Sequence, residues 1–336
     1  MESNLLTPPA ARVGAVIGAA ASVIFLAHLS YFAINVPSLE SETIFFSRTI
    51  ACASAILSLF LINKVLSAWT GDGVVGASAA LGFLLFPATA FVYGLFVPIA
   101  MLVLLFLLGV WLATVIDCGA HILVPLLIGG IAAALPFLAI GGFYLSAALL
   151  CLVAIERPPK RFLMIAAGAV VLFGVALSFS LPGIENIVPK AWGFVSMPVL
   201  LDGVVRPYAM LWLGLAFSFC SALGSKSLRQ CLSSVLVRRL AVIAIVFCLA
   251  MLSMIIGDRD GGTDLSLALA FNAILPLGVM LTLPMVLWIR FVMPQVKSIW
   301  IWILLPVVMY SCFWVVLGPI DLSAFPYDQI GSRSKP

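Results

Sequence analysis

Charged side chains are scarce in this sequence, which has 17 basic and 13 acidic residues among 336. They make up 9% of the chain, whereas an average soluble domain is roughly one quarter charged. Because 64% of the residues are hydrophobic, a soluble globular fold is excluded and lipid must solvate most of the surface. Backbone groups find no water in hydrocarbon, so we expect an all-α, polytopic transmembrane helical bundle.

Several kinds of functional site are also missing from the sequence. The seven cysteines show no C-x-x-C spacing, so neither a disulfide framework nor a zinc site is predicted. No nucleophile elbow, phosphate-binding glycine loop or H-E-x-x-H motif occurs, which removes the common soluble-enzyme chemistries. The net charge of +4 is small and its basic residues lie at the ends of apolar runs. Lipid headgroups are therefore expected as their partners, and nucleic acid is not.

Long apolar runs take the place of these motifs. A helix needs about 20 mostly apolar residues to cross roughly 30 Å of hydrocarbon. We expect eleven spans in a single membrane domain, at 13–34, 44–62, 74–92, 95–116, 122–137, 139–155, 162–181, 207–223, 240–256, 265–289 and 298–317. The pairs that meet at 93–94 and 141–142 have almost no loop, and either pair could instead be a hairpin that does not cross. A count of nine would leave every later span on the same side.

The basic residues crowd into every second gap, which predicts an orientation. With residues 1–12 as a cytoplasmic tail and 318–336 as an external tail, eleven of the 17 basic residues lie inside, as the positive-inside rule requires. The inner basic residues are Arg12, Lys64, Arg157, Lys160, Arg161, Lys226, Arg229, Arg238, Arg239, Arg290 and Lys297. Nine of the 13 acids lie outside. The first span is too long for a signal-peptide core, so we expect an uncleaved anchor and a multi-pass protein of the inner (plasma) membrane.

Two polar side chains fall within the expected spans. His28 lies in the outer third of the first span and Asn272 lies in the tenth. Polar groups at such depth are costly, which makes each of them a functional candidate. Each also has a structural interpretation: His28 could form a hydrogen-bonded helix contact near the interface. Asn272, four residues before Pro276, could bond backbone groups that the proline leaves free.

The first outer loop holds the sharpest group of polar residues. Glu40 and Glu42 precede the second span, and Arg48 follows at its head. A carboxylate here could take the proton of an acceptor hydroxyl or hold a divalent cation, and no other cofactor is indicated. The alternative is a solvated helix start, in which Ser41 or Thr43 caps the helix and the acids lie in its first turn.

The outer loop 182–206 and a later outer loop offer cations. Lys190 and Arg206 belong to the first of these loops and Arg259 to the second. Arginine can bind a phosphate through a bidentate fork and lysine as a point charge. Together with Arg48, these residues are the expected ligands of a lipid phosphate.

This order of features resembles the GT-C superfamily of polyprenyl-phosphate-sugar-dependent glycosyltransferases, particularly the protein mannosyltransferase and aminoarabinose transferase type. The likeness lies in the acids after the first span, the stretches 42–64 and 71–87 with a Leu-Phe-Pro ending, the glycine-rich hairpin 129–156 and the outer loop 182–206. The resemblance implies that Glu40 or Glu42 deprotonates an acceptor at the outer face. It also implies that the outer loop closes over a polyprenyl-phosphate-linked sugar.

The chain would be a short or degenerate version of that type. Its first outer loop is short, and the segment 91–95 contains no acid where the family has a second acidic position. Two other classes of function stay open. One is a transporter or flippase of lipid-linked intermediates, which the proline-broken spans favour. The other is a non-catalytic membrane subunit in envelope assembly, with membrane proteins as its partners.

Overall fold

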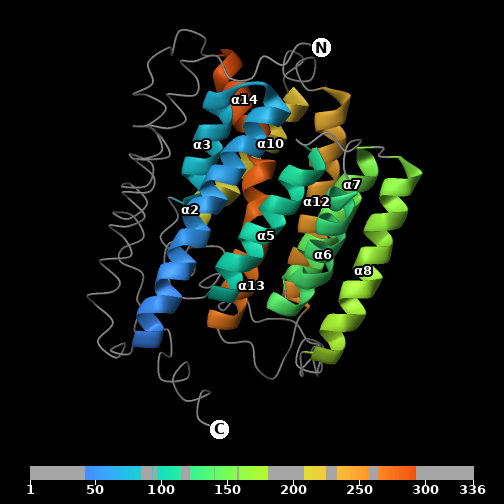
Figure 1. Ribbon diagram of the computed structural model, residues 1–336. Coiled ribbons are helices and arrows are strands. Elements are labelled where there is room, and N and C mark those ends of the chain that lie inside the picture. Colours follow the sequence, from blue (N-terminus) through green and yellow to red (C-terminus); the bar gives the residue numbers. More distant parts are fainter. Residues whose placement is uncertain are drawn as a thin grey trace.

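The computed structural model describes residues 42–84, 93, 97–114, 122–139, 141–156, 159–180, 208–224, 233–256 and 264–292. Apart from short turns these residues are helical, and none of them lies in a strand. The helices are α2 (Glu42–Thr70), α3 (Gly73–Leu84), α5 (Val97–Thr114), α6 (Leu123–Leu138), α7 (Gly142–Ile155), α8 (Lys160–Ser180), α10 (Ala209–Gly224), α12 (Ser234–Ile255), α13 (Asp264–Leu281) and α14 (Leu283–Val292). They form a bundle of elongated, roughly aligned helices (Figure 1).

Among the residues that the structure describes, four apolar segments are long enough to cross a membrane. They are Thr49–Thr70, Lys160–Leu177, Ser234–Ile255 and Ala270–Trp288. Shorter apolar helices lie between them, and α6 and α7, with 16 and 14 residues, are only about 24 and 21 Å long at 1.5 Å per residue. The prediction of a helical protein with apolar helices of membrane length is confirmed for the described part of the chain.

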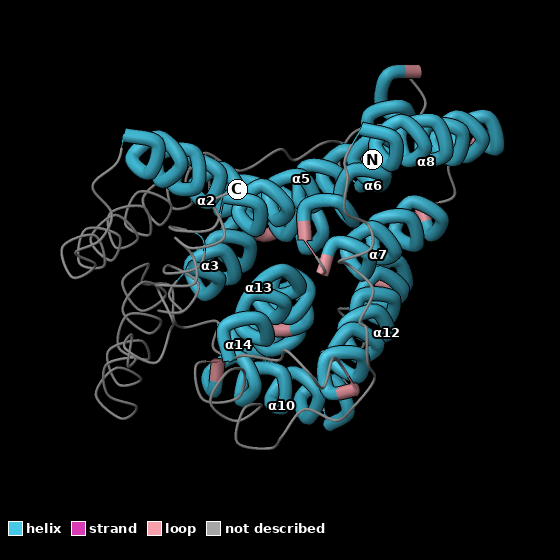
Figure 2. Tube along the Cα trace, turned by 90° about the horizontal axis from the view of Figure 1, so that it is seen from below, coloured by secondary structure: helices cyan, strands magenta, loops and turns pink. Residues whose placement is uncertain are grey.

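Helix α13 occupies the centre of the bundle. Ten consecutive residues, 271–280, are buried. The helix contacts α3, α5, α7, α10, α12 and α14, and Figure 2 shows these helices arranged around it. A helix that is apolar on every side can be buried on every side, and this stretch has that composition apart from Asn272.

Helix α8 lies at the edge of the bundle and packs chiefly against α6. Gly129 of α6 permits the close approach, because a Cβ there would lie 2.4 Å from the carbonyl oxygen of Ala166. Most of the remaining surface of α8 is apolar and exposed, including Met164 and Leu172 at 66% and 67%. Only 17% of its membrane-length segment is buried, so this surface suits contact with lipid tails.

The helix found at the second expected span is longer than the apolar run 44–62 that predicted it. Helix α2 continues past residue 62 to Thr70, because Ser67 donates to the Asn63 side-chain oxygen at 3.0 Å and so keeps these polar groups within the helix. Gly76 of α3 lies against this turn, where an added Cβ would meet Ser67 Oγ at 2.1 Å. Gly71 then ends the helix with a φ of 72°, in the left-handed region that glycine tolerates.

The expected span 265–289 is two helices in the structure. Helices α13 and α14 meet at Thr282, whose hydroxyl donates to the carbonyl of Val279 at 2.7 Å. Pro284 follows in the first turn of α14, where its missing N–H costs no helical hydrogen bond. Ser218 of α10 accepts the N–H of Met285 at 3.2 Å, which supports the new helix start.

Candidate functional site

A cluster of polar side chains lies in the core around Asn272 of α13. Asn272, Tyr93 and Tyr208 are each no more than 1% exposed. The Tyr93 hydroxyl donates to the backbone carbonyl of Asn272 at 2.7 Å, and the Asn272 amide nitrogen donates to the Tyr208 hydroxyl. The Tyr208 ring packs against Phe271 with their centroids 4.5 Å apart. The cluster thus joins α13 to two distant parts of the chain.

The hydrogen bond from Tyr93 has its cause in the sequence of α13. Pro276 lies inside this helix and has no N–H, so the carbonyl four residues earlier, that of Asn272, loses its helical donor. The phenol supplies a donor to that carbonyl from outside the helix. From the sequence alone, the Asn272 side chain is a candidate to bond a backbone group freed by the proline. The freed group is instead its own carbonyl, and a tyrosine bonds it.

The same arrangement occurs in α6. Pro136 lies inside that helix and leaves the Ala132 carbonyl without its helical donor. Ser146 of α7, which is buried, donates its hydroxyl to this carbonyl at 2.7 Å. In both helices a hydroxyl from a neighbouring segment bonds the carbonyl that the proline leaves without its helical donor. Because these groups are neutral and packed into the core, their arrangement favours a structural role over acid–base chemistry.

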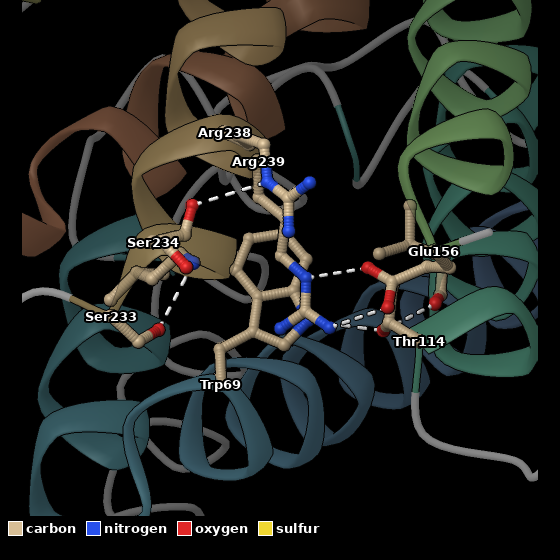
Figure 3. A network of polar contacts seen from close by, with 9 residues as sticks. Trp69, Thr114, Glu156, Ser233, Ser234, Arg238 and Arg239 are labelled. Carbon is tan, nitrogen blue, oxygen red and sulfur yellow. Dashed lines mark hydrogen bonds and ion pairs between the residues drawn. The ribbon is translucent and has the colours of Figure 1, made fainter.

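A second polar group lies at one end of the bundle, where Arg239 pairs with Glu156. Arg239 Nε and Nη2 donate to the two Glu156 carboxylate oxygens at 2.7 and 3.0 Å (Figure 3). The guanidinium carbon of Arg239 lies 5.0 Å from the ring centroid of Trp69. Trp69 Nε1 in turn donates to Thr114 Oγ1 at 3.0 Å. The group therefore joins the ends of α2, α5, α7 and α12.

The Glu156–Arg239 pair connects α7 to α12, and the charge of Glu156 does not stabilise α7 by itself. Glu156 is the C-cap of α7, where the carbonyls of the last turn repel a carboxylate. The positive charge of Arg239, in the second turn of α12, offsets this repulsion. The start of α12 is capped by Ser233, whose Oγ accepts the Leu236 N–H. The two charged side chains are only 17% and 11% exposed, so water screens their attraction weakly.

The charged residues that the structure describes separate by helix end. At the end of the Glu156–Arg239 pair lie Lys64, Asp72, Glu156, Lys160, Arg161, Arg238, Arg239 and Arg290. At the opposite end lie Glu42, Arg48 and Asp264. The sequence analysis assigns the first set to one side of the membrane and the second set to the other. Their grouping in space agrees with that alternation.

Few residues of the predicted catalytic and phosphate site belong to the described part of the chain. Glu42 is the first residue of α2, and Arg48 lies two turns into the same helix. The predicted residues that lie outside the described ranges are His28, Glu40, Lys190, Arg206 and Arg259. Whether the two outer loops converge therefore stays a prediction.

The Glu156–Arg239 pair is a feature that the sequence analysis does not single out. Glu156 and Arg239 are 83 residues apart. The sequence indicates only that both lie in gaps between apolar runs on the same predicted side of the membrane. Within the ranges that the structure describes, no three His, Cys, Asp or Glu side chains gather as metal ligands would. Comparisons with protein-family models, with curated proteins and with solved structures give no match.

Proposed function

We propose that this chain is a multi-pass plasma-membrane protein that transfers a sugar from a polyprenyl-phosphate carrier to an acceptor at the outer face. The separation of charges supports the orientation. Six basic residues of the described part lie at the end of the Glu156–Arg239 pair, and one, Arg48, lies at the opposite end. Under the positive-inside rule the first end is cytoplasmic. We propose with it an N-terminus inside, a C-terminus outside and about eleven spans between them.

The length of α2 supports the placement of Glu42 at the outer interface. Lys64 follows Glu42 by 22 positions in this helix, which is about 33 Å at 1.5 Å per residue. Hydrocarbon is roughly 30 Å thick, so the acid and the lysine can lie at the two interfaces of one bilayer. This acidic start of α2, at the end of the bundle with few basic residues, is the observation that carries the proposal.

The chemistry then follows from the position of the carboxylates. Glu40 or Glu42 accepts the proton of the acceptor hydroxyl while the acceptor's hydroxyl oxygen bonds to the anomeric carbon of the sugar. The bond between that carbon and the phosphate oxygen breaks, and the polyprenyl phosphate leaves. Cations at the outer face stabilise the leaving phosphate, with Arg48, Lys190, Arg206 and Arg259 as the candidates. A divalent cation held by the two acids would serve the same purpose.

Transport of a lipid-linked intermediate needs polar groups along a path through the membrane. The polar residues that gather around Asn272 are at most 1% exposed, and the Tyr93 hydroxyl among them bonds the carbonyl that Pro276 leaves free in α13. Within the described core they offer no polar surface to a passing headgroup. Sugar transfer at the interface is therefore the function that we favour.

The test is a deletion of the gene followed by complementation. Deletion should leave an undischarged polyprenyl-phosphate sugar, detected by mass spectrometry of the lipid extract, and should remove one sugar from a surface glycan. The E40Q/E42Q variant should insert normally and fail to restore transfer. The control is D72N, because the asparagine side chain can still accept the Val74 N–H that Asp72 accepts at 2.8 Å. Full restoration by E40Q/E42Q, or an unchanged lipid-linked sugar pool after deletion, would contradict the proposal and favour a non-catalytic subunit.

A further inference from the structure

Three exposed cations lie close in sequence to the Glu156–Arg239 pair. Lys160 and Arg161 are the first two residues of α8, and Arg238 directly precedes Arg239 in α12. We call Lys160, Arg161 and Arg238 the basic rim. Arg239 itself is satisfied by Glu156 and stacks on Trp69, so the pair is neutral and the surplus positive charge belongs to the rim.

The ion pair, together with the short chain segment after Glu156, links the two helix ends that carry the basic rim. Glu156 is bonded to Arg239 directly, and Arg238 is its neighbour in the chain. Lys160 follows Glu156 by four residues, so their Cα atoms are at most about 14 Å apart at 3.3–3.6 Å per residue. The Lys160 backbone therefore lies within about 14 Å of the residue whose carboxylate Arg239 binds. Arg238 is further held by its Nε, which donates to the Ser234 carbonyl at 3.3 Å.

Exposed apolar side chains directly border these cations on both helices. On α8 they are Leu163 and Met164, which are 38% and 66% exposed. On α12 the corresponding residue is Val237, which is 47% exposed. Each half of the rim therefore combines positive charge at the helix end with apolar surface along the helix. This combination complements a molecule that has an anionic head and hydrocarbon tails.

We propose that the basic rim binds the phosphate of an anionic phospholipid in the adjoining leaflet, whose acyl chains lie on the exposed faces of α8 and α12. The charge of the rim selects an anionic head over a zwitterionic one, because each lysine or arginine near such a surface contributes about 1 kcal/mol of attraction. The arginines can also bond phosphate oxygens through their fork of N–H groups. This site lies at the opposite end of the bundle from Glu42 and does not depend on sugar transfer.

The experiment titrates phosphatidylglycerol and phosphatidylcholine onto the purified full chain and follows each bound lipid by native mass spectrometry. The wild-type protein should bind its first phosphatidylglycerol more tightly than phosphatidylcholine. The triple variant K160Q/R161Q/R238Q should weaken binding of that first phosphatidylglycerol by roughly 100-fold, since each of the three lost cations weakens binding by about fivefold. Its affinity for phosphatidylcholine, in which the choline offsets the phosphate charge, should fall by less than about fivefold. Each single variant should show the fivefold loss, and unfolding midpoints check that the proteins fold.

The matched control is K64Q, which removes one cation at the same end of the bundle. Lys64 belongs to α2, where its ammonium lies 5.3 Å from the centroid of the Phe60 ring. We expect K64Q to change phosphatidylglycerol binding by less than twofold. An equal loss for K64Q and R161Q would mean that the attraction is diffuse, and unchanged binding by the triple variant would remove the site. Either result overturns the proposal.

Discussion

Replacing Tyr93 with phenylalanine removes only the hydroxyl that donates to the Asn272 carbonyl. A buried group that loses its hydrogen-bond partner costs about 1–3 kcal/mol. Measured helix–helix hydrogen bonds within membranes average about 0.6 kcal/mol and reach about 1.7 kcal/mol. Tyr93 is 1% exposed and Asn272 is 0% exposed, so water cannot replace the lost donor. We therefore expect the Y93F variant to lose about 1.5 kcal/mol of unfolding free energy.

The proline supplies the decisive comparison. In the P276A variant residue 276 regains an N–H that can donate to the Asn272 carbonyl within α13. Adding Y93F to P276A should then cost no more than about 0.5 kcal/mol, so the two substitutions should couple by about 1 kcal/mol. Unfolding in mixed micelles with increasing dodecyl sulfate measures all four proteins. The control is Y144F, which removes the Tyr144 hydroxyl that donates to Ser253 between α7 and α12.

Two results would refute the explanation that Tyr93 replaces the helical donor that Pro276 removes. One is an equal cost of Y93F with and without Pro276, and the other is an equal coupling of P276A to Y144F. Helix α6 allows the same experiment to be repeated independently, because Ser146 bonds the carbonyl that Pro136 leaves free. There S146A should be costly in the wild-type protein and nearly neutral in P136A.

Two further substitutions test the packing and the ion pair. G142A should unfold the protein or cost more than about 2 kcal/mol, because its Cβ would lie 1.9 Å from a backbone oxygen of α6. Its control, G168A, has nothing within 4 Å of the new Cβ and should leave unfolding unchanged; similar losses for both would contradict the close contact at Gly142. E156Q should cost about 2 kcal/mol, below the 3–5 kcal/mol of a fully buried pair because 17% of the side chain is exposed. An unchanged unfolding curve for E156Q would show that the pair does not hold α7 to α12.

Apolar run lengths predicted the bounds of two helices closely. The expected span 122–137 became α6 at Leu123–Leu138, and 95–116 became α5 at Val97–Thr114. Hydropathy did not predict the C-terminal end of α2, because the expected span ends at residue 62. There Ser67 and Asn63 satisfy one another inside the helix, so the backbone continues to Thr70 although the run is no longer apolar.

Contacts between distant segments could not be predicted in the same way. The charge pattern put Glu156 and Arg239 on one side of the membrane, but a side shared by many gaps does not specify partners. Pro276 indicated that backbone groups near Asn272 lack a partner, but the donor to the Asn272 carbonyl is Tyr93, which is 179 residues away. Periodicity describes single helices, and the partners depend on which helices become neighbours.

The central position of α13 has a consequence for biosynthesis. The described helices that surround it, except α14, precede it in the chain and leave the ribosome first. They cannot close their shared core before residues 271–280 arrive, because those residues fill its middle. The nascent bundle must therefore stay open on the side that admits α13. Its earlier helices need lipid or an insertion factor to cover their inner faces until synthesis has passed residue 281.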